Sequence, residues 1–249
     1  MIDILRIFPK EFLRYKRKIN IVPIFILYIT IIFSRMKMMQ NKDFSNLDKD
    51  ALNHIIKSAT TTVGVMVEGG VVIGTESQAT AGYTVATKTA QKLFQINDYT
   101  AATISGGVAD CQYVINQIRA LSRLKEVEES DVPEPKYIAN ITRNILFSGR
   151  SYYLSMMIVG GYSIEEKSGK LYGVDLLGTL FEEEKFLSFG SGSPFSLGVL
   201  EADWKPKMTK EEGIELIKTA ISSSRERDAA SGFKIQICII DKDGFKQIQ

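Results

Sequence analysis

The sequence predicts an α+β fold in which antiparallel sheets are covered by helices. Segments with the alternation typical of strands come in neighbouring pairs joined by short turn signals, and segments with helical periodicity also come in consecutive pairs. The composition fits this class, because 45% hydrophobic and 24% charged residues are ordinary for a globular protein. The part of the chain from residue 60 onward has the length of a single domain.

Eight segments are predicted to be strands because β-branched and aromatic residues alternate along them. In order, they are residues 60–68, 71–76, 92–96, 100–105, 154–162, 171–175, 235–240 and 245–248. Turn signals join them in pairs, at Gly69-Gly70, at Asn97-Asp98, over the polar residues 165–169 and at Asp243-Gly244. Strands joined by turns this short run antiparallel.

Four segments are predicted to be helices because their apolar residues recur at three- and four-residue spacing. They run from Gly106-Gly107 to about Leu124, and over residues 135–147, 193–204 and 209–227. The last helix begins with Thr209-Lys-Glu-Glu212, which is typical of a capping box. Residues 126–135 are acidic and end in two prolines, so a loop is predicted between the first two helices.

Residues 1–59 differ from the rest of the chain in charge. They carry eleven Lys or Arg and five Asp or Glu, a net charge of +6, whereas residues 60–249 carry −4. Residues 19–33 are almost wholly apolar, but they are fewer than the roughly 20 residues of a membrane span, and Pro23 interrupts them. We predict that residues 1–59 are a removed prosegment, that residues 60–249 form the folded domain, and that no stable membrane anchor remains.

Two alternatives stay open for this segment. Translation that starts at Met36, Met38 or Met39 would leave residues 1–35 unmade, and residues 19–33 could instead be a short membrane anchor. Intact mass or N-terminal sequencing of the precursor separates these alternatives, because a species that begins at Met1 excludes the late start.

The cysteine and histidine content limits the chemistry available to the chain. Cys111 and Cys238 are too few for a disulfide scaffold or a Cys-rich zinc site, and a reducing compartment is the default expectation. His54 is the only histidine, and it falls in a short helix predicted over residues 47–56, where it is interpreted as a solvated residue. An enzyme built from residues 60–249 would therefore need another base. The net charge of +2 gives no general case for a nucleic-acid binder.

Thr60 offers such a base if the chain is cut between Ala59 and Thr60. The freed α-amine, with a pKa near about 8, can act as general base for the hydroxyl of the same residue. Glu76 lies 16 residues further on and can return beside Thr60 on a hairpin, and Lys92 lies 32 residues on. A lysine between an acid and an amine would lower the pKa of the threonine hydroxyl. The same residues also fit an ordinary strand with surface charges, so both interpretations stay open at this point.

Six motifs lie in order along residues 60–249. They are TTTVG at 60–64, SQAT at 77–80, K-x-x-x-K-L-F-Q-I at 88–96, SGGVAD at 105–110, GSGSP at 190–194 and RDAASG at 227–232. Together they resemble proteasome β subunits, of the archaeal 20S type. The resemblance implies a four-layer αββα sandwich, an N-terminal nucleophile hydrolase in which autolysis exposes a catalytic threonine, and threonine endopeptidase activity.

The resemblance also implies a role for each matched residue. Thr60 would be the nucleophile, Lys92 would tune its hydroxyl, and Glu76 would orient the lysine. The residues that would support the threonine amine are Ser191, Asp228 and Ser231, and the backbone N–H of Gly106 would form the oxyanion hole. The substrate would bind as an added strand along Thr80, Gly106 and Ala109. The pocket for its side chain would be lined by Ala79, Ala90, Phe94, Ile104, Val108 and Gln112, and without the resemblance these six would be read as core residues.

That pocket is mostly apolar and uncharged, so cleavage after hydrophobic residues, called chymotrypsin-like, is expected. The implied chemistry needs no metal and no organic cofactor. Three positions depart from the family pattern: Ala59 stands where glycine is usual, Gln78 where arginine is frequent, and Ala109 where glycine is common. Ala59 narrows the accessible backbone conformations, so autolysis is expected to be slower or to depend on assembly.

The resemblance implies a set of partners for a cytoplasmic protein. They are homologous β subunits in a seven-membered ring, a ring of proteasome α subunits, an ATP-dependent unfoldase, and unfolded polypeptides as substrates. Two other functions stay open. One is a catalytically silent β subunit that serves ring assembly, although Thr60, Lys92 and Asp228 are all retained. The other is a binding protein tethered to a membrane by residues 19–33.

Overall fold

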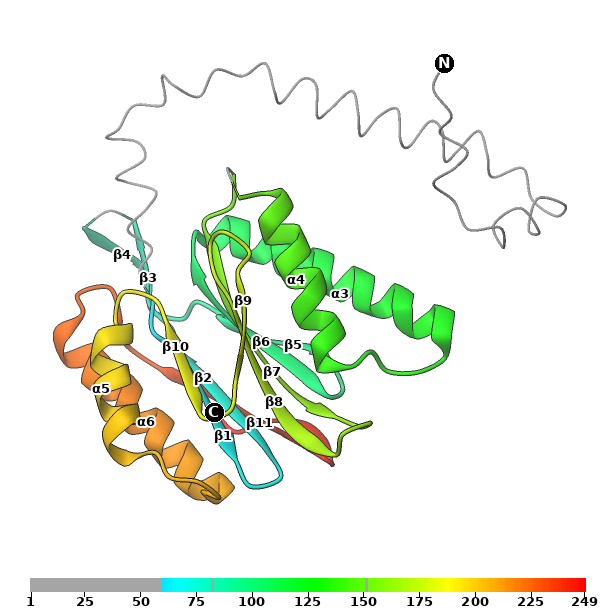
Figure 1. The fold of residues 1–249 in the computed structure, drawn as a ribbon. Helices are drawn as coiled ribbons and strands as arrows, with labels where there is room; N and C mark the ends of the chain where they lie inside the picture. Colours follow the sequence, from blue (N-terminus) through cyan, green and yellow to red (C-terminus); the bar gives the residue numbers. More distant parts are fainter. Residues whose placement is uncertain (1–59, 82, 151) are drawn as a thin grey trace, which may run out of the picture. The chain divides into compact units, whose positions relative to one another are not determined.

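Two five-stranded antiparallel sheets lie face to face between two pairs of helices (Figure 1). The structure is a computed structural model that describes residues 60–81, 83–150 and 152–249. The first sheet has the order β10 (Phe186–Phe189), β1 (Thr62–Val67), β2 (Gly70–Glu76), β11 (Ile235–Asp241), β12 (Gly244–Gln247). The second has the order β5 (Leu93–Asn97), β6 (Thr100–Gly106), β7 (Ser155–Ser163), β8 (Ser168–Val174), β9 (Leu180–Glu183).

The helices form the two outer layers. They are α3 (Val108–Glu129), α4 (Pro135–Ser148), α5 (Ser193–Asp203) and α6 (Lys210–Arg227). Helices α3 and α4 pack on the second sheet, and α5 and α6 pack on the first (Figure 1). The predicted four-layer αββα sandwich of antiparallel sheets is therefore confirmed.

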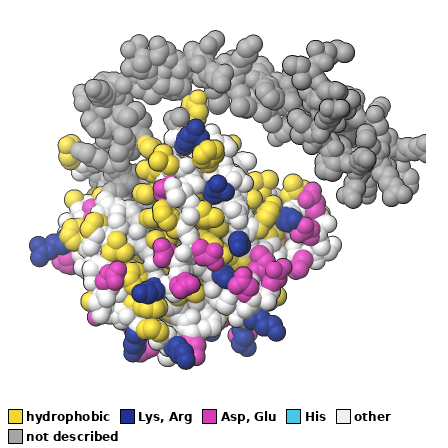
Figure 2. Space-filling model, in the orientation of Figure 1, with side chains coloured by type: hydrophobic (Ala, Val, Ile, Leu, Met, Phe, Trp, Pro, Cys, Tyr) yellow, Lys and Arg dark blue, Asp and Glu magenta, His cyan; other side chains and the backbone are white. Residues whose placement is uncertain are grey.

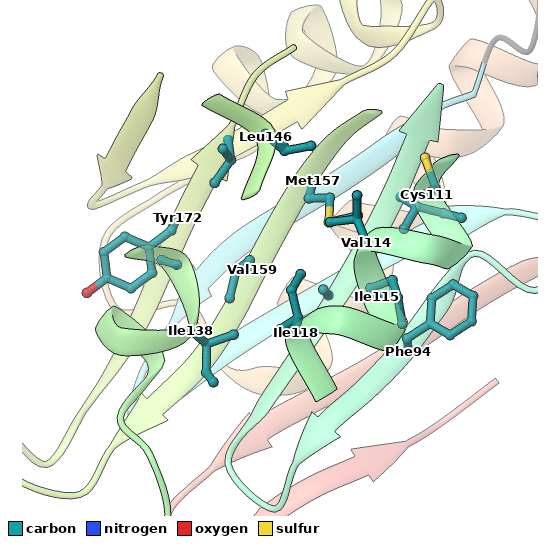
Figure 3. Close-up of a cluster of buried hydrophobic side chains, with 14 residues drawn as sticks. Phe94, Cys111, Val114, Ile115, Ile118, Ile138, Leu146, Met157, Val159 and Tyr172 are labelled. Atoms are coloured by element: carbon teal, nitrogen blue, oxygen red, sulfur yellow. The ribbon is translucent and has the colours of Figure 1, made fainter. Parts of the chain in front are cut away.

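Three hydrophobic clusters fill the spaces between these layers. The first lies between the second sheet and helices α3 and α4, and Ile115, Ile118 and Ile138 belong to it (Figure 3). The second lies between the first sheet and helices α5 and α6, and the third between the two sheets. Alternate residues of β2 serve different clusters, since Val71 and Ile73 face the other sheet while Val72 faces the helices. Strands buried on both faces explain why β2 reads as a continuous apolar run.

Helix α3 is longer than predicted. It continues through Glu129, so the predicted loop over residues 126–135 is wrong for its first four positions. Charge pairs one turn apart stabilise this acidic end, with Arg123 2.7 Å from Glu126 and Lys125 in contact with Glu129. The helix ends where Ser130 adopts a left-handed conformation with φ of 57°.

Four short strands were not predicted. They are β3 (Ala79–Ala81), β4 (Thr84–Thr87), β9 and β10. The pair β3–β4 forms a small separate sheet, β9 pairs with the preceding strand β8, and β10 pairs with β1, which is distant in sequence. Segments of three or four residues carry too little alternation to be recognised, and their pairing partners supply most of their stabilisation. The predicted turns are confirmed to within two residues, the largest difference being at residues 165–169, where β8 already begins at Ser168. The capping box at Thr209 and Glu212 is confirmed.

Several predictions concern residues outside the described part of the chain. They are the apolar segment 19–33, the helix over 47–56 with His54, and Ala59. Within the described ranges, no helix is both long and apolar enough to cross a membrane. On the face in view, acidic and basic side chains are interspersed, with apolar side chains between them (Figure 2).

Candidate active site

Three predicted residues meet at the start of the first sheet. The hairpin β1–β2 pairs Thr62 with Thr75, so that Glu76 returns beside the beginning of the domain. Lys92 directly precedes β5. Its Nζ lies 2.9 Å from Thr60 Oγ1 and 2.5 Å from Glu76 Oε1. The Lys92 ammonium therefore bridges the Thr60 hydroxyl and the Glu76 carboxylate.

All three side chains are buried, and this decides their electrostatics. The exposed fractions of Thr60, Glu76 and Lys92 are 1%, 0% and 2%. Burial lowers the pKa of the Lys92 ammonium, and the Glu76 charge opposes that shift. Burial likewise raises the pKa of Glu76, and Lys92 offsets it. Each charge is thus the main compensation for the other in a low-dielectric site.

Glu76 is fixed by backbone groups as well as by the lysine. Its second oxygen, Oε2, accepts hydrogen bonds from Gln78 N at 2.6 Å and from Gly232 N at 3.1 Å. These donors stabilise the ionised carboxylate and orient it. The carboxylate therefore presents its other oxygen to the Lys92 ammonium.

A second network surrounds Asp228, which caps the C-terminal end of α6. Its Oδ2 accepts hydrogen bonds from Ser191 Oγ at 2.5 Å and from Ser231 Oγ at 2.6 Å. Ser231 Oγ also lies 2.7 Å from Thr61 Oγ1. The network thus contains the three predicted supporting residues, and it extends to the side chain of Thr61, the residue next to Thr60.

The turn between β10 and α5 packs closely against Thr60. Gly190 has φ of 103°, and a Cβ at this position would lie 1.7 Å from Thr60 O. Only glycine fits both the conformation and the space. The GSGSP motif therefore does more than carry Ser191, because its first glycine permits the turn to approach the threonine backbone.

Gly106 ends β6, and one residue, the N-cap Gly107, separates it from α3. Gly106 has φ of 123°, and a Cβ there would lie 2.2 Å from Leu154 O. The tight turn from strand to helix therefore requires glycine at this position. Ala109 follows, exposed in the first turn of α3.

The predicted substrate-binding residues come from four elements. Ala79 and Thr80 lie in β3, Phe94 in β5, Ile104 in β6, and Val108, Ala109 and Gln112 in α3, while Ala90 lies in the loop before β5. Phe94 and Ile104 are 7% and 2% exposed and belong to the cluster under α3 (Figure 3). Ala109 and Gln112 are exposed, and Val108 and Ala90 are half-buried. Ala79 is also buried, at 7% exposure, so the described structure buries three of the six predicted pocket side chains.

Sequence reasoning missed the roles of several contacting residues. Thr61 stands within the TTTVG motif, and its position beside Thr60 was a usable signal. The Gln78 side chain was noted only as a departure from the family, yet its Nε2 donates to Ala229 O at 3.0 Å and links the β2–β3 turn to the turn after Asp228. Gln236 was also missed, although its Oε1 accepts hydrogen bonds from Lys92 N and Leu93 N. It is one residue of an alternating strand, and nothing in its local sequence distinguishes it.

Comparisons with known proteins all match this chain to proteasome subunits. A family model described as "Proteasome subunit" matches residues 56–240, a range that includes every site residue above. The chain is 40% identical over 192 residues to the proteasome subunit beta of Methanocaldococcus jannaschii, which covers 77% of this chain and 85% of that protein. It is 38% identical over 194 residues to the proteasome subunit beta of Archaeoglobus profundus, with 78% and 89% covered. It is 36% identical over 194 residues to proteasome subunit beta 2 of Aeropyrum pernix, with 78% and 87% covered.

Proposed function

Since this chain belongs to the proteasome subunit family, we propose that it is a threonine endopeptidase subunit of a 20S core particle. The observation that carries the proposal is the contact of Lys92 Nζ with the Thr60 hydroxyl, backed by Glu76. Burying an ion pair costs desolvation free energy. Ring assembly alone does not require such a pair in contact with a threonine hydroxyl, so its presence favours a catalytic subunit over a silent one.

The first chemical step is autolysis. Thr60 Oγ1 attacks the carbonyl carbon of Ala59. As the C–N bond between Ala59 and Thr60 breaks, the nitrogen takes the hydroxyl proton and becomes the free Thr60 α-amine, and Ala59 is left as an ester on Thr60 Oγ1. Water then hydrolyses this ester, which restores the Thr60 hydroxyl and leaves a carboxyl group on Ala59. Residues 1–59 then leave as a prosegment. The new amine replaces the histidine that residues 60–249 lack.

Peptide hydrolysis follows on the same hydroxyl. The amine takes the hydroxyl proton as Thr60 Oγ1 attacks a peptide carbonyl, and it gives that proton to the departing peptide amine. An acyl ester on Thr60 remains. The amine then takes a proton from water, which attacks the ester and releases the second peptide while the proton returns to Thr60 Oγ1. The Lys92 charge lowers the cost of negative charge on that oxygen throughout.

The surrounding backbone supplies the remaining parts of the site. Gly106 N–H, at the turn into α3, stabilises the oxyanion, and the substrate lies as an extended strand along Thr80 and Ala109. Ser191, Asp228 and Ser231 support the Thr60 amine, because their network ends one residue away at Thr61. No metal or organic cofactor takes part in these steps.

We further propose that the chain works in the cytoplasm within a ring of seven homologous β subunits, beside a ring of α subunits. An ATP-dependent unfoldase would deliver unfolded polypeptides. Large apolar side chains exposed on the isolated chain support such packing, among them Leu124, Val127, Phe147, Leu177 and Phe195.

The experiment that tests the function is the intact mass of the subunit in its native particle, together with peptide hydrolysis by that particle. We expect a mass that begins at Thr60 and a particle that cleaves peptides. A particle that digests peptides while Ala59 is still joined to Thr60 contradicts the mechanism. An unprocessed and inactive subunit supports the assembly role instead.

The pocket residues predict a hydrophobic preference. Fluorogenic peptides with Leu, Tyr or Phe before the scissile bond are expected to be cleaved at least about 10-fold faster than peptides with Arg or Asp, because one misfitting or unpaired group costs about 1–3 kcal/mol. The measurement is kcat/KM for matched peptides on the assembled particle. Faster cleavage after Arg or Asp would refute the chymotrypsin-like assignment.

A further inference from the structure

Gln236 links the two sheets at the segment that carries Lys92. It lies in β11 opposite Thr75 of β2, in the first sheet. Its Oε1 accepts hydrogen bonds from Lys92 N at 3.1 Å and from Leu93 N at 3.2 Å, where the second sheet begins. Its Nε2 donates to Ala90 O at 2.7 Å. One side-chain amide thus binds three backbone groups within four residues.

An amide suits these contacts because it combines an acceptor oxygen with an N–H donor in one rigid plane. The two N–H groups lie at the start of β5, an edge strand whose ladder partner is β6. On the other side of the same segment, Ile104 N donates to Lys92 O at 3.0 Å. The backbone at Lys92 is therefore held from both sides, by β6 and by Gln236.

The Lys92 side chain depends on this anchoring. Lysine has four rotatable side-chain bonds, so the position of its Nζ follows from where its backbone is fixed and from the Glu76 contact. A second side chain helps to fix the segment, since Ser77 Oγ donates to Lys88 O at 2.7 Å and Ala90 N donates to Ser77 O at 2.9 Å. Gln236 is distinct in that it acts on Lys92 itself.

We propose that Gln236 is a positioning residue for the threonine peptidase, which fixes the Ala90–Leu93 backbone so that Lys92 Nζ meets Thr60 Oγ1. This inference rests on the proposed function. Gln236 touches the reacting hydroxyl only through Lys92. A misplacement of about 1 Å at a catalytic group can cost about 10²-fold in rate, so a contact of this kind has a measurable effect.

The first test is Gln236→Met, which keeps the length of the side chain and removes its hydrogen bonds. Gln247→Met is the matched control, because Gln247 is exposed in the adjacent strand β12. Both variants are assayed as assembled particles, with kcat expressed per processed Thr60 N-terminus counted by mass spectrometry. We expect Gln236→Met to lower kcat by about 10- to 100-fold with KM changed by less than about 3-fold. Gln247→Met is expected to match the wild type.

The second test is Gln236→Glu. It also tests the proposal if the Gln236→Met subunit does not assemble into particles. A carboxyl oxygen still accepts from Lys92 N and Leu93 N, and the ionised group loses the N–H donated to Ala90 O. We expect kcat within about 3-fold of the wild type at pH 8, because the contacts at Lys92 remain. If Gln236 had only a general structural role, both variants would give fewer particles, and kcat would not differ between Gln236→Met and Gln236→Glu.

Two outcomes overturn the inference alone. They are a Gln236→Met particle with the kcat of the Gln247→Met control, and a Gln236→Glu particle that loses as much kcat as Gln236→Met. In both cases the wild type still processes itself and cleaves peptides, so the proposed function stands. A wild-type particle without processing or hydrolysis overturns the function and the inference together.

Discussion

Thr60→Ala is expected to abolish both self-cleavage and peptide hydrolysis. Removing the nucleophile from a hydrolase costs about 10⁶-fold in kcat where it has been measured, so a loss of at least about 10⁴-fold is expected here. The physical reason is that no other hydroxyl is in contact with the Lys92 ammonium among the hydrogen bonds of the described residues. The measurements are the mass of the subunit, which should retain Ala59, and the rate of peptide hydrolysis.

Two further variants make this result specific. Thr60→Ser keeps a hydroxyl at the same position and is expected to process itself and to retain activity within about 100-fold. Thr103→Val is the matched control, because Thr103 is a buried threonine whose Oγ1 has no hydrogen-bond partner in the described part of the chain. It is expected to leave the rate unchanged. Peptide hydrolysis by Thr60→Ala particles would show that another residue is the nucleophile.

Lys92→Met is expected to lower kcat by about 10³-fold and to destabilise the subunit. The rate falls because the positive charge next to Thr60 Oγ1 is lost. Stability falls because Glu76, 0% exposed, keeps a buried charge without its partner, and breaking such a pair typically costs about 3–5 kcal/mol. The measurements are kcat of assembled particles and the thermal midpoint of the subunit.

The double variant Lys92→Met with Glu76→Gln separates these two effects. It removes the uncompensated carboxylate, so the thermal midpoint is expected to recover towards the wild type. The rate is expected to stay low, because no ammonium is restored. Recovery of both stability and activity would mean that Lys92 acts only in folding, contrary to the proposed mechanism.

The pH dependence of the wild type follows from the same groups. Activity rises with pH as the Thr60 α-amine, with an ordinary pKa near about 8, loses its proton and becomes a base. Burial lowers the pKa of Lys92 from its ordinary 10.5, so the lysine loses its proton at a lower pH than an exposed lysine would. Activity is expected to fall as the pH rises through this lowered pKa, because the neutral lysine no longer stabilises negative charge on Thr60 Oγ1. The expected profile of kcat is bell-shaped. A plateau that continues above pH 10.5 would contradict the role of the charged lysine.

Much of the fold could be predicted from local patterns. Hairpins with short turns, the amphipathic helices and the capping box are determined by residues within about 20 positions, and the structure confirms them. The approach of Glu76 to Thr60 is of this kind, because one β-hairpin brings its two ends together. The end of α3 was misjudged because acidic residues and nearby prolines suggested a loop, whereas charge pairs one turn apart stabilise the helix.

The motifs were sufficient to predict the family, the sandwich class and the grouping of Thr60, Glu76 and Lys92. Which distant segments meet at these residues became visible only from the packing of the two sheets. β10 pairs with β1 and brings Gly190 against Thr60, and Gln236 reaches Lys92 across 144 positions of sequence. The physical reason is that such contacts depend on how two whole sheets pack, and periodicity along one segment carries no record of the partner it will face.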